Sequence, residues 1–503
     1  RAVLGSAPRA TVKVADVPIA AAPSGNGPTD SGRSGIHGRM ARLPFTGADS
    51  AQPAEIAMWI AAVVACLGLA VLVRAAGRGW EPLPTTFAGL PFTANRRPGV
   101  SPVSLLAPAV AAVVLIAAWR GVHTRLRWVP LLVTGYGAAL GWIVALAAGN
   151  ARSGPAGALA VSTFTASDGH LPELGAAETD PTALLRTFTE HAGTYSYGTR
   201  AHPPGPALLV WTLARLGITT PTALGIVLTA LSAATVPLVA IAVRSLCHET
   251  AARRLVPVLV LAPWALWMAA SVDGVTAAVG AAFVTLGVVG SEPGRRLWWA
   301  AACGLLFGVA TLFSYAMPWL GAVVAATYFI RRRPLLNVIT GGCFLVPLSL
   351  MSLWGFSWPD GLAVAREQAA QAAMQVTRVG AATLPGSVTR LPVGLAVVLV
   401  ACGPMIVRAA RRVRLTPGWP FLVGAVPAIL FGMVTGLAAA TLERSWLPFY
   451  CWLVVPALAP NPRPDGPGDI VRAGALPLGL AGLGALTAIV AQTVVEIGPS
   501  GPL

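Results

Sequence analysis

The residues best suited to chemistry close a polar stretch, 150–217, in a chain that is otherwise strongly apolar. This stretch contains the sequence Thr-Arg-Ala-His-Pro-Pro-Gly-Pro at positions 199–206. The two prolines after His202 fix the backbone, and Gly205 lets it turn. A titratable imidazole is thereby held at the predicted boundary between membrane and water. A passive membrane helix does not need this arrangement, whereas a reaction centre that faces a lipid-borne substrate could use it.

Ionisable side chains are concentrated in the same stretch. Asp168 and His170 lie in the short polar sequence Ala-Ser-Asp-Gly-His, and Glu173 follows shortly after. A carboxylate or imidazole in such a loop could act as a general base or acid. We expect Asp168 to be the functional carboxylate, whereas Glu178 and Glu190 are interpreted as solvated loop residues.

The stretch also predicts two short helices. Asp180 followed by Pro181 is typical of a helix start, with the Asp side chain as the cap and Pro at the first helical position. A second helix is predicted at 203–217, a segment too short to cross a membrane. Its leucines would share one face, which fits a helix that lies in the membrane interface; they are Leu208, Leu209, Leu213 and Leu216.

Four further candidates lie at the ends of apolar runs, on the side where the polar stretch is predicted to lie. Asp273 and Glu443 are carboxylates near membrane depth, where ionisable groups are costly and are usually paired or functional. Arg444 follows Glu443, and the two could instead form a structural ion pair or anchor the helix end. Tyr315 could equally belong to the aromatic belt of a membrane protein.

The composition places these residues in a membrane protein. The chain of 503 residues is 55% hydrophobic and 11% charged, against about 25% charged residues in soluble proteins. The net charge of +16 comes almost entirely from arginines in short segments between apolar runs. That distribution follows the positive-inside rule and argues against a nucleic-acid partner.

The apolar runs predict an all-α polytopic membrane protein with about 13 membrane-spanning helices, in a range of about 11–14. Residues 1–54 are predicted to be a disordered cytoplasmic segment, 55–127 to hold N-terminal membrane helices, 128–460 to form the core, and 461–503 to form a C-terminal helix and tail. The predicted spans are 55–75, 101–119, 128–149, 221–243, 255–271, 274–290, 297–315, 317–330, 335–354, 392–409, 418–438, 446–459 and 474–494.

The arginine distribution predicts the orientation. Five short segments rich in arginine, at 120–127, 244–254, 295–296, 331–333 and 408–414, fall on one side if the N-terminus is cytoplasmic. The segments 150–217 and 355–391 are then long outer loops, and the candidate site faces outward from the plasma (inner) membrane.

The order of these features resembles the GT-C superfamily of integral membrane glycosyltransferases, which includes protein mannosyltransferases and the lipid A aminoarabinose transferase. The resemblance rests on an apolar span, an acidic outer loop, the His-Pro-Pro element at His202, and an Asp after a later span. It covers roughly residues 128–460. The sequence Leu-Glu-Arg-Ser-Trp-Leu-Pro at 442–448 is also similar to a segment of uncharacterised actinobacterial membrane proteins of this type.

The resemblance implies an inverting transferase that takes a sugar from a polyprenyl-phosphate donor. The acceptor would be an envelope glycan, glycolipid or protein in the extracytoplasmic space, and mannose and arabinofuranose are sugars that fit such an envelope. Asp168 matches the base that deprotonates the acceptor, with Glu173 as second choice. His202 and Arg200 match the cations near the donor phosphate, and a divalent metal ion is left open as a cofactor.

Two alternatives remain open at the level of sequence. One is a transporter or flippase of lipid-linked glycans, and the other is a non-catalytic membrane subunit of an envelope assembly complex. The family often has an acidic pair directly after its first core span, where this chain has Gly-Asn-Ala-Arg at 149–152. Ionisable residues at the outer ends of apolar runs, rather than in their middle, favour the enzyme.

Overall fold

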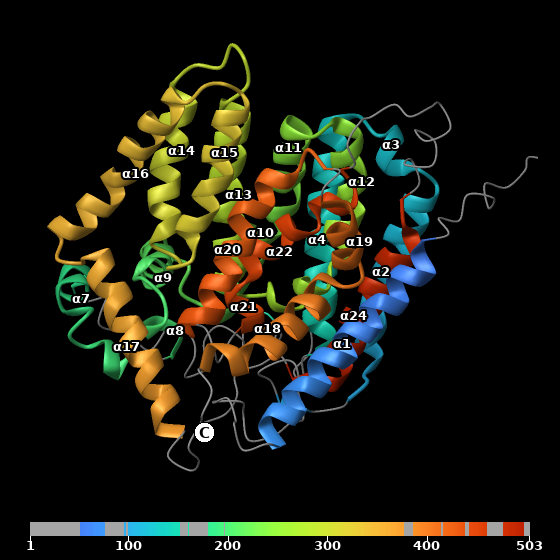
Figure 1. Ribbon diagram of the computed structural model, residues 1–503, viewed down its shortest axis with the longest axis horizontal. Coiled ribbons are helices and arrows are strands. Elements are labelled where there is room, and N and C mark those ends of the chain that lie inside the picture. The colour runs from blue at the N-terminus through green and yellow to red at the C-terminus, as the bar shows by residue number, and fades with distance from the viewer. Residues whose placement is uncertain are drawn as a thin grey trace, which may run out of the picture. The chain divides into compact units, whose positions relative to one another are not determined.

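The computed structural model describes residues 51–75, 95–96, 99–150, 159, 180–195, 197–376, 386–413, 416–437, 442–459 and 476–496. Within these residues the fold is helical (Figure 1), apart from one antiparallel pair of two-residue strands, β1 (Asn95–Arg96) and β2 (Val495–Glu496). The predicted helical fold class is thereby confirmed. The segment predicted as disordered, 1–54, lies outside the described residues up to position 50. The first helix includes residues 52–54, because a proline in the first turn and a following Ala and Glu favour helix.

The described helices follow one another closely along the chain. They are α1 (Gln52–Ala75), η3 (Pro102–Leu105), α2 (Leu106–Trp119), α3 (Val122–Arg125), α4 (Trp128–Asn150), α7 (Pro181–Thr187), η4 (Ala192–Thr194), α8 (Tyr197–Arg200), α9 (Gly205–Arg215), α10 (Pro221–Ala233), α11 (Thr235–Leu246), α12 (Glu249–Val260), η5 (Pro263–Trp267), α13 (Val272–Gly290), α14 (Trp298–Thr311), η6 (Met317–Leu320), α15 (Gly321–Ile330), α16 (Leu335–Leu353), α17 (Trp358–Val376), α18 (Gly386–Cys402), α19 (Met405–Arg412), α20 (Trp419–Thr435), α21 (Leu442–Ser445), α22 (Leu447–Leu453), η9 (Val455–Ala457) and α24 (Leu478–Val494).

Six described helical segments are long and apolar enough to cross a membrane. They are Gln52–Leu72, Pro102–Trp119, Trp128–Gly149, Pro221–Leu246, Val272–Gly290 and Leu335–Leu353. A seventh arises if Leu391–Cys402 and Met405–Arg412, which meet at 102°, form one bent span. The other apolar helices are shorter than a membrane crossing requires. The chain is a multi-pass membrane protein, but the predicted count of about 13 spans is not confirmed.

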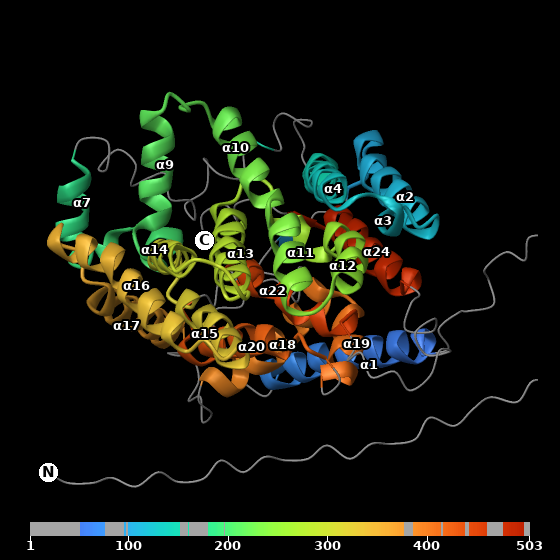
Figure 2. The same cartoon turned by 90° about the horizontal axis from the view of Figure 1, so that it is seen from above.

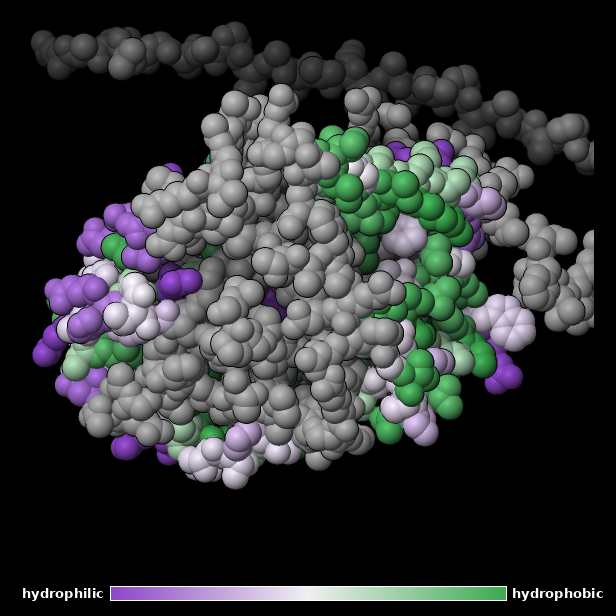
Figure 3. Space-filling view, turned by 90° about the horizontal axis from the view of Figure 1, so that it is seen from below, coloured by the Kyte–Doolittle hydropathy of each residue, from purple (hydrophilic) through white to green (hydrophobic). Residues whose placement is uncertain are grey.

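The outer surface agrees with this assignment. Large apolar side chains are exposed along α1 and α2, among them Val64, Leu72 and Val113. Figure 3 shows hydrophobic residues gathered on that side of the molecule and hydrophilic residues on the opposite side, where α7 and α17 lie. In a soluble protein such a continuous apolar face would be unfavourable, whereas lipid chains solvate it well.

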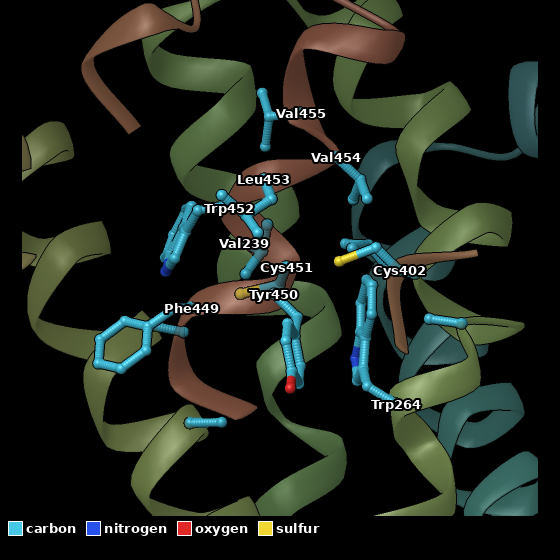
Figure 4. Packing of buried hydrophobic residues seen from close by; sticks show 14 of the residues in the cluster. Val239, Trp264, Cys402, Phe449, Tyr450, Cys451, Trp452, Leu453, Val454 and Val455 are labelled. Atoms are coloured by element: carbon cyan, nitrogen blue, oxygen red, sulfur yellow. The ribbon is translucent and has the colours of Figure 1, made fainter. Parts of the chain in front are cut away.

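The centre of the bundle is filled by aromatic side chains of α22 (Figure 4). The ring of Tyr450 stacks against Trp264 of η5 with centroids 6.2 Å apart, and Trp452 stacks against Phe421 of α20 at 4.9 Å. All four side chains are buried. A short helix of seven residues thus joins η5 and α20 in one core.

Arginines hold several turns together at one end of the bundle, called here the arginine-rich end. Arg331, just after α15, donates to the carbonyl of Val288 near the end of α13 at 2.7 Å and also to the carbonyl of Ser245 in α11. Arg333 donates to the carbonyl of Glu292 at 2.8 Å. The last carbonyls of a helix have no partner within the helix, so these guanidinium groups satisfy them.

A second set of contacts brings the turn around α3 to the same end. Arg253 of α12 donates to the carbonyls of Leu126 at 2.7 Å and His123 at 3.2 Å. The turns at 120–127, 244–254, 291–296 and 331–333 therefore lie at one end of the bundle, in agreement with the charge pattern (Figure 1).

A buried ion pair fastens α1 to α19. The Nε atom of Arg408 donates to Oε2 of Glu55 at 2.9 Å, and the two side chains are 2% and 3% exposed. Arg411, half exposed, lies 3.8 Å from Oε1 of Glu55. A buried carboxylate needs such partners, because desolvation of an unpaired charge costs about 3 kcal/mol or more.

Helices α14 and α16 approach each other closely because α14 carries glycine at the contact. A Cβ atom on Gly304 would overlap the carbonyl of Thr340, and one on Gly308 would lie 2.9 Å from the ring of Pro347. Small residues spaced four apart allow two membrane helices to pack backbone to backbone. This pairing supports the end of α14, where the candidate site begins.

The predicted helix start at Asp180 is confirmed. The Asp180 carboxylate accepts from the backbone N–H of Thr182 at 2.9 Å and of Ala183 at 3.1 Å, and Pro181 occupies the first position of α7. The hydrogen bond from the Thr182 hydroxyl, followed by the one from the Ala183 amide, lowers the pKa of Asp180.

Acidification is expected to loosen the start of α7. Since the pKa of Asp180 is lowered in the folded protein, its stabilising effect is present above the unfolded pKa of about 3.9 and is lost as the pH falls below that value. The protection factors of the Thr182 and Ala183 amides, which compare each exchange rate with the intrinsic rate at the same pH, should therefore fall at low pH. Asp180→Asn should cap the helix without this pH dependence. Protection factors that are unchanged by acid in the wild-type protein would contradict the assignment.

Candidate functional site

The segment that holds His202 is fastened to the end of α14. After α8 the chain bends, and the His202 N–H donates to the carbonyl of Thr199 at 3.3 Å. The Gly205 N–H, which begins α9, donates to the carbonyl of Leu312 at 2.9 Å. His202 and the two following prolines are buried. The rigid His-Pro-Pro-Gly element predicted from the sequence is therefore held at both ends by backbone hydrogen bonds.

The helix that follows differs in part from its prediction. Helix α9 forms as a short helix within 203–217 and lies across the bundle, as Figures 1 and 2 show together. The predicted leucine face is wrong in detail, since Leu216 is 72% exposed while Val210 is buried. The reason is packing on two sides: Leu208 contacts a cluster around Leu312, and Val210 and Leu213 contact a cluster with α10, α13 and Phe313.

The structure brings His202 together with Asp273. The Nε2 atom of His202 lies 3.6 Å from Oδ1 of Asp273, and their side chains are 11% and 24% exposed. Asp273 lies in the first turn of α13, where Ser271 caps the helix by accepting from the Gly274 N–H at 3.4 Å. An acidic residue is favoured there by the helix dipole. The pair is thus a mostly buried imidazole beside a carboxylate that remains open to solvent.

This pair lies at the end of α13 opposite the arginine-rich end. A helix of 19 residues is about 28 Å long. Its last turn receives the hydrogen bond from Arg331 to the Val288 carbonyl, whereas Asp273 is in its first turn. We call the end that carries His202 and Asp273 the site end. Arg200, the last residue of α8, is half-buried two positions before His202.

The Tyr315 side chain lies inside the protein and not in an aromatic belt at the membrane interface. It is buried, and its ring packs edge-on against Trp358 of α17 with centroids 5.5 Å apart. Its hydroxyl faces Gly361, where a Cβ atom would lie 2.7 Å away. Burial raises the pKa of Tyr315, so the phenol stays protonated at neutral pH. Tyr315 therefore joins α17 to the loop between α14 and α15.

Glu443 and Arg444 lie in the four-residue helix α21. Glu443 is buried and Arg444 is half-buried. Helix α21 contacts α13, the helix that carries Asp273. The sequence placed these residues at the end of an apolar run, and the structure adds that Glu443 faces the protein interior.

Three predicted site residues lie outside the described residues. They are the catalytic candidates Asp168 and Glu173, together with His170. Their assignment therefore stays a prediction, and the structure reports on the part of the site around His202, Asp273, Arg200 and α21.

The described residues do not form a metal centre. Among them no group of three or more His, Cys, Asp or Glu side chains gathers as metal ligands would. His202 and Asp273 supply two donors, whereas protein sites for zinc use at least three protein ligands.

The contact between His202 and Asp273 was not predicted from the sequence, although both residues were named as site candidates. The available signals were local: a proline-fixed imidazole, and an Asp two positions after a Ser that could cap a helix. The contact depends on the hydrogen bond from Gly205 to the carbonyl of Leu312, just after α14, and on the packing of Val210 and Leu213 of α9 against α13.

Replacement of Gly205 by alanine is expected to displace this element. A Cβ atom at this position would overlap the carbonyl of Leu312, which costs about 1–3 kcal/mol when the surroundings must shift. If His202 is functional, such a displacement should lower activity by about 10²-fold. The matched control is Gly141→Ala, since nothing lies within 4 Å of a Cβ atom there. Equal thermal stability and equal activity of the two variants would show that the anchor is unimportant.

Comparisons with known proteins give limited likeness. No protein-family model matches the sequence, and no curated protein matches it. The crystal structure of the Archaeoglobus fulgidus oligosaccharyltransferase in complex with zinc and sulfate is similar at a TM-score of 0.33 and 12% identity, over 60% of this chain and 45% of that one. The apo structure of ArnT from Cupriavidus metallidurans is similar at 0.24 and 14%, over 61% and 73%. The chain thus spans less than half of the oligosaccharyltransferase, and at these TM-scores neither likeness carries an inference.

Proposed function

We propose that this chain is an integral membrane glycosyltransferase of the GT-C type. It would move a sugar from a polyprenyl-phosphate donor to an envelope glycan, glycolipid or protein on the extracytoplasmic side of the plasma membrane. The observation that carries the proposal is the pairing of His202 with Asp273 at 3.6 Å. This pair is held at the end of a membrane helix, where the phosphate of a membrane-embedded lipid would lie.

The chemistry needs a cation beside the leaving group. When the acceptor oxygen bonds to the anomeric carbon, the bond from that carbon to the phosphate oxygen breaks, and the phosphate keeps the electron pair. The developing negative charge is stabilised by a positively charged donor already in place. His202 in its protonated form would supply this donor, with Arg200 nearby. Asp273, on the neighbouring helix α13, lies close enough to hold the imidazole in its orientation.

The acceptor must also lose a proton. We assign this to the carboxylate of Asp168, with Glu173 as the alternative base, in keeping with the resemblance in the acidic loop. The acceptor hydroxyl would give its proton to this carboxylate as it attacks from the face opposite the phosphate, which inverts the anomeric configuration.

The deciding experiment is a glycosyl-transfer assay with the purified full-length chain and a panel of polyprenyl-phosphate sugars. Wild-type protein is compared with Asp168→Asn and Glu173→Gln, and Glu190→Gln serves as a control in the same loop. Turnover that collapses only in Asp168→Asn supports the proposed base, and collapse only in Glu173→Gln moves the role there. If folded wild-type protein showed no turnover with any donor, the proposal that the chain is a glycosyltransferase would be wrong.

A transporter of lipid-linked glycans is the second candidate, and one observation favours it. Helices α18 and α19 meet at 102°, an interruption of the kind that transporters use at binding sites. In vesicles, a transporter would move labelled lipid-linked glycan between leaflets without transferring the sugar. Binding of the lipid with neither transfer nor movement would instead favour the non-catalytic subunit.

A further inference from the structure

The turn between α2 and α4 carries three exposed arginines. Arg120 follows the end of α2, and Arg125 and Arg127 flank the junction of α3 and α4. The turn is tight, because Gly121 adopts the left-handed conformation with φ +71° and the Thr124 hydroxyl donates to its carbonyl at 2.7 Å. Three guanidinium groups are therefore confined to one turn at the arginine-rich end, which we call the α3 turn.

Glu249, at the start of the neighbouring helix α12, is already paired with other arginines. Glu249 lies 2.6 Å from the guanidinium of Arg253 and 2.7 Å from that of Arg244. Arg253 in turn braces the α3 turn through the carbonyls of Leu126 and His123. None of the ion pairs found in the described part of the chain includes the three arginines of the α3 turn.

The potential around the turn is accordingly positive. Burial, and then the charges of Arg254 and Arg253, lower the pKa of His123 in the middle of the turn. The guanidinium of Arg244 lies over the ring of Trp128 at 4.5 Å, so positive charge also borders the start of α4. An anion at the α3 turn would be attracted by its neighbours as well as by the turn itself.

The turn also lies where lipid headgroups lie. It joins two segments that are long enough to cross a membrane, Pro102–Trp119 and Trp128–Gly149. Trp119 and Trp128 mark the two ends, as tryptophans do at membrane interfaces. Trp119, Val122 and Val129 are 51%, 36% and 66% exposed, so apolar surface continues from the arginines toward the bilayer. Figure 2 shows α2 and α3 at the edge of the bundle.

We infer that the α3 turn binds the phosphate headgroup of an anionic phospholipid. Arginine pairs with phosphate through two parallel hydrogen bonds, and three arginines could surround one headgroup. The exposed apolar side chains beside them would contact the acyl chains, which a soluble phosphate lacks. This site is at the opposite end of the bundle from His202 and is independent of the proposed transfer reaction.

The test measures lipid bound to the full-length protein by native mass spectrometry. Protein in nanodiscs of phosphatidylcholine with a minor fraction of phosphatidylglycerol is compared with Arg125→Gln/Arg127→Gln. The control, Arg296→Gln/Arg332→Gln, removes two exposed arginines from other turns at the same end. Loss of one direct hydrogen-bonded pair between a guanidinium and the phosphate should weaken binding about ten-fold, so the α3-turn variant, which loses two, should bind about a hundred-fold more weakly. The control should retain wild-type binding.

Three outcomes would overturn the inference. They are equal retention of phosphatidylglycerol and phosphatidylcholine by the wild-type protein, an equal loss in the control, and binding of glycerol phosphate as strong as that of the lipid. Arg125→Lys/Arg127→Lys keeps the charge but loses the paired hydrogen bonds, so it should recover only part of the binding. The substituted side chains are exposed, and unchanged thermal unfolding in phosphatidylcholine confirms that each variant is folded.

Discussion

Replacement of His202 by alanine is expected to lower the rate of glycosyl transfer by about 10²–10³-fold. This is the effect of removing one preorganised donor that stabilises developing negative charge. The side chain is 11% exposed and lies beside Asp273, so a hydrogen bond that it donates to the phosphate would form in a partly desolvated site. The measurement is the steady-state transfer rate with the best polyprenyl-phosphate sugar of the panel.

The matched control is His191→Ala, which removes an exposed histidine from the segment between α7 and η4. It should transfer sugar at the wild-type rate. If His202→Ala did so too, the proposed role of His202 in binding the phosphate would be wrong. Thermal unfolding of both variants separates loss of chemistry from loss of structure.

Asp273 is proposed to act through His202, so the effects of replacing the two residues should not be additive. Asp273→Asn should lower the transfer rate, because the imidazole loses the carboxylate that lies 3.6 Å from its Nε2 atom. In the double variant Asp273→Asn/His202→Ala the loss of rate should be no larger than in His202→Ala alone, which a double-mutant cycle measures. Additive losses would contradict this role of Asp273.

Removal of Arg408 is expected to have the largest effect on stability. Arg408→Ala leaves the Glu55 carboxylate 3% exposed without its principal partner, which costs about 3–5 kcal/mol for a broken buried pair. The measurement is the thermal unfolding midpoint in detergent, or the free energy of unfolding from titration with a denaturing detergent.

The neighbouring Arg411 supplies the control. Its side chain is 50% exposed and lies 3.8 Å from Glu55, so Arg411→Ala should change the free energy of unfolding by less than about 1 kcal/mol. The double variant Glu55→Leu/Arg408→Met should recover most of the loss, since apolar pairs often replace buried ion pairs without cost. Equal stability of Arg408→Ala and the wild-type protein would disprove the ion pair's role.

Local sequence signals predicted local structure well. The cap at Asp180 was predicted because an Asp before a Pro satisfies the first amides of a helix whatever surrounds it. The positions of the membrane helices followed from their apolar runs for a similar reason. For the segment Trp128–Gly149, for example, the predicted limits at 128 and 149 agree with the observed ones.

The number of spans was harder to predict, because hydropathy does not distinguish lipid from protein interior. The segment Val272–Gly290 has 72% of its most apolar window buried inside the protein. The run predicted at 255–271 is divided into α12 and η5 around Pro263, and neither part is long enough to span. Apolar runs that fill a core and apolar runs that face lipid are thus alike in hydropathy, and the count of about 13 is not confirmed.

The candidate site needed contacts between distant segments. His202 was predicted from its own prolines, but its position beside Asp273 depends on the packing of α9 against α13 and on the hydrogen bond from Gly205 to Leu312. Likewise, the partner of Glu55 is 353 positions away in the chain. No periodicity or motif within one segment contains that information, since it arises only when the helices pack.

The arginine contacts at one end of the bundle also bear on biosynthesis. The carbonyls of Ser245 and Val288 belong to helices made early, yet the guanidinium that binds both comes from Arg331, which leaves the ribosome after them. Until then those helix ends depend on water and headgroups for hydrogen bonds. The segment from α11 to α15 should therefore become protease-resistant in one step, once Arg331 has emerged during translation.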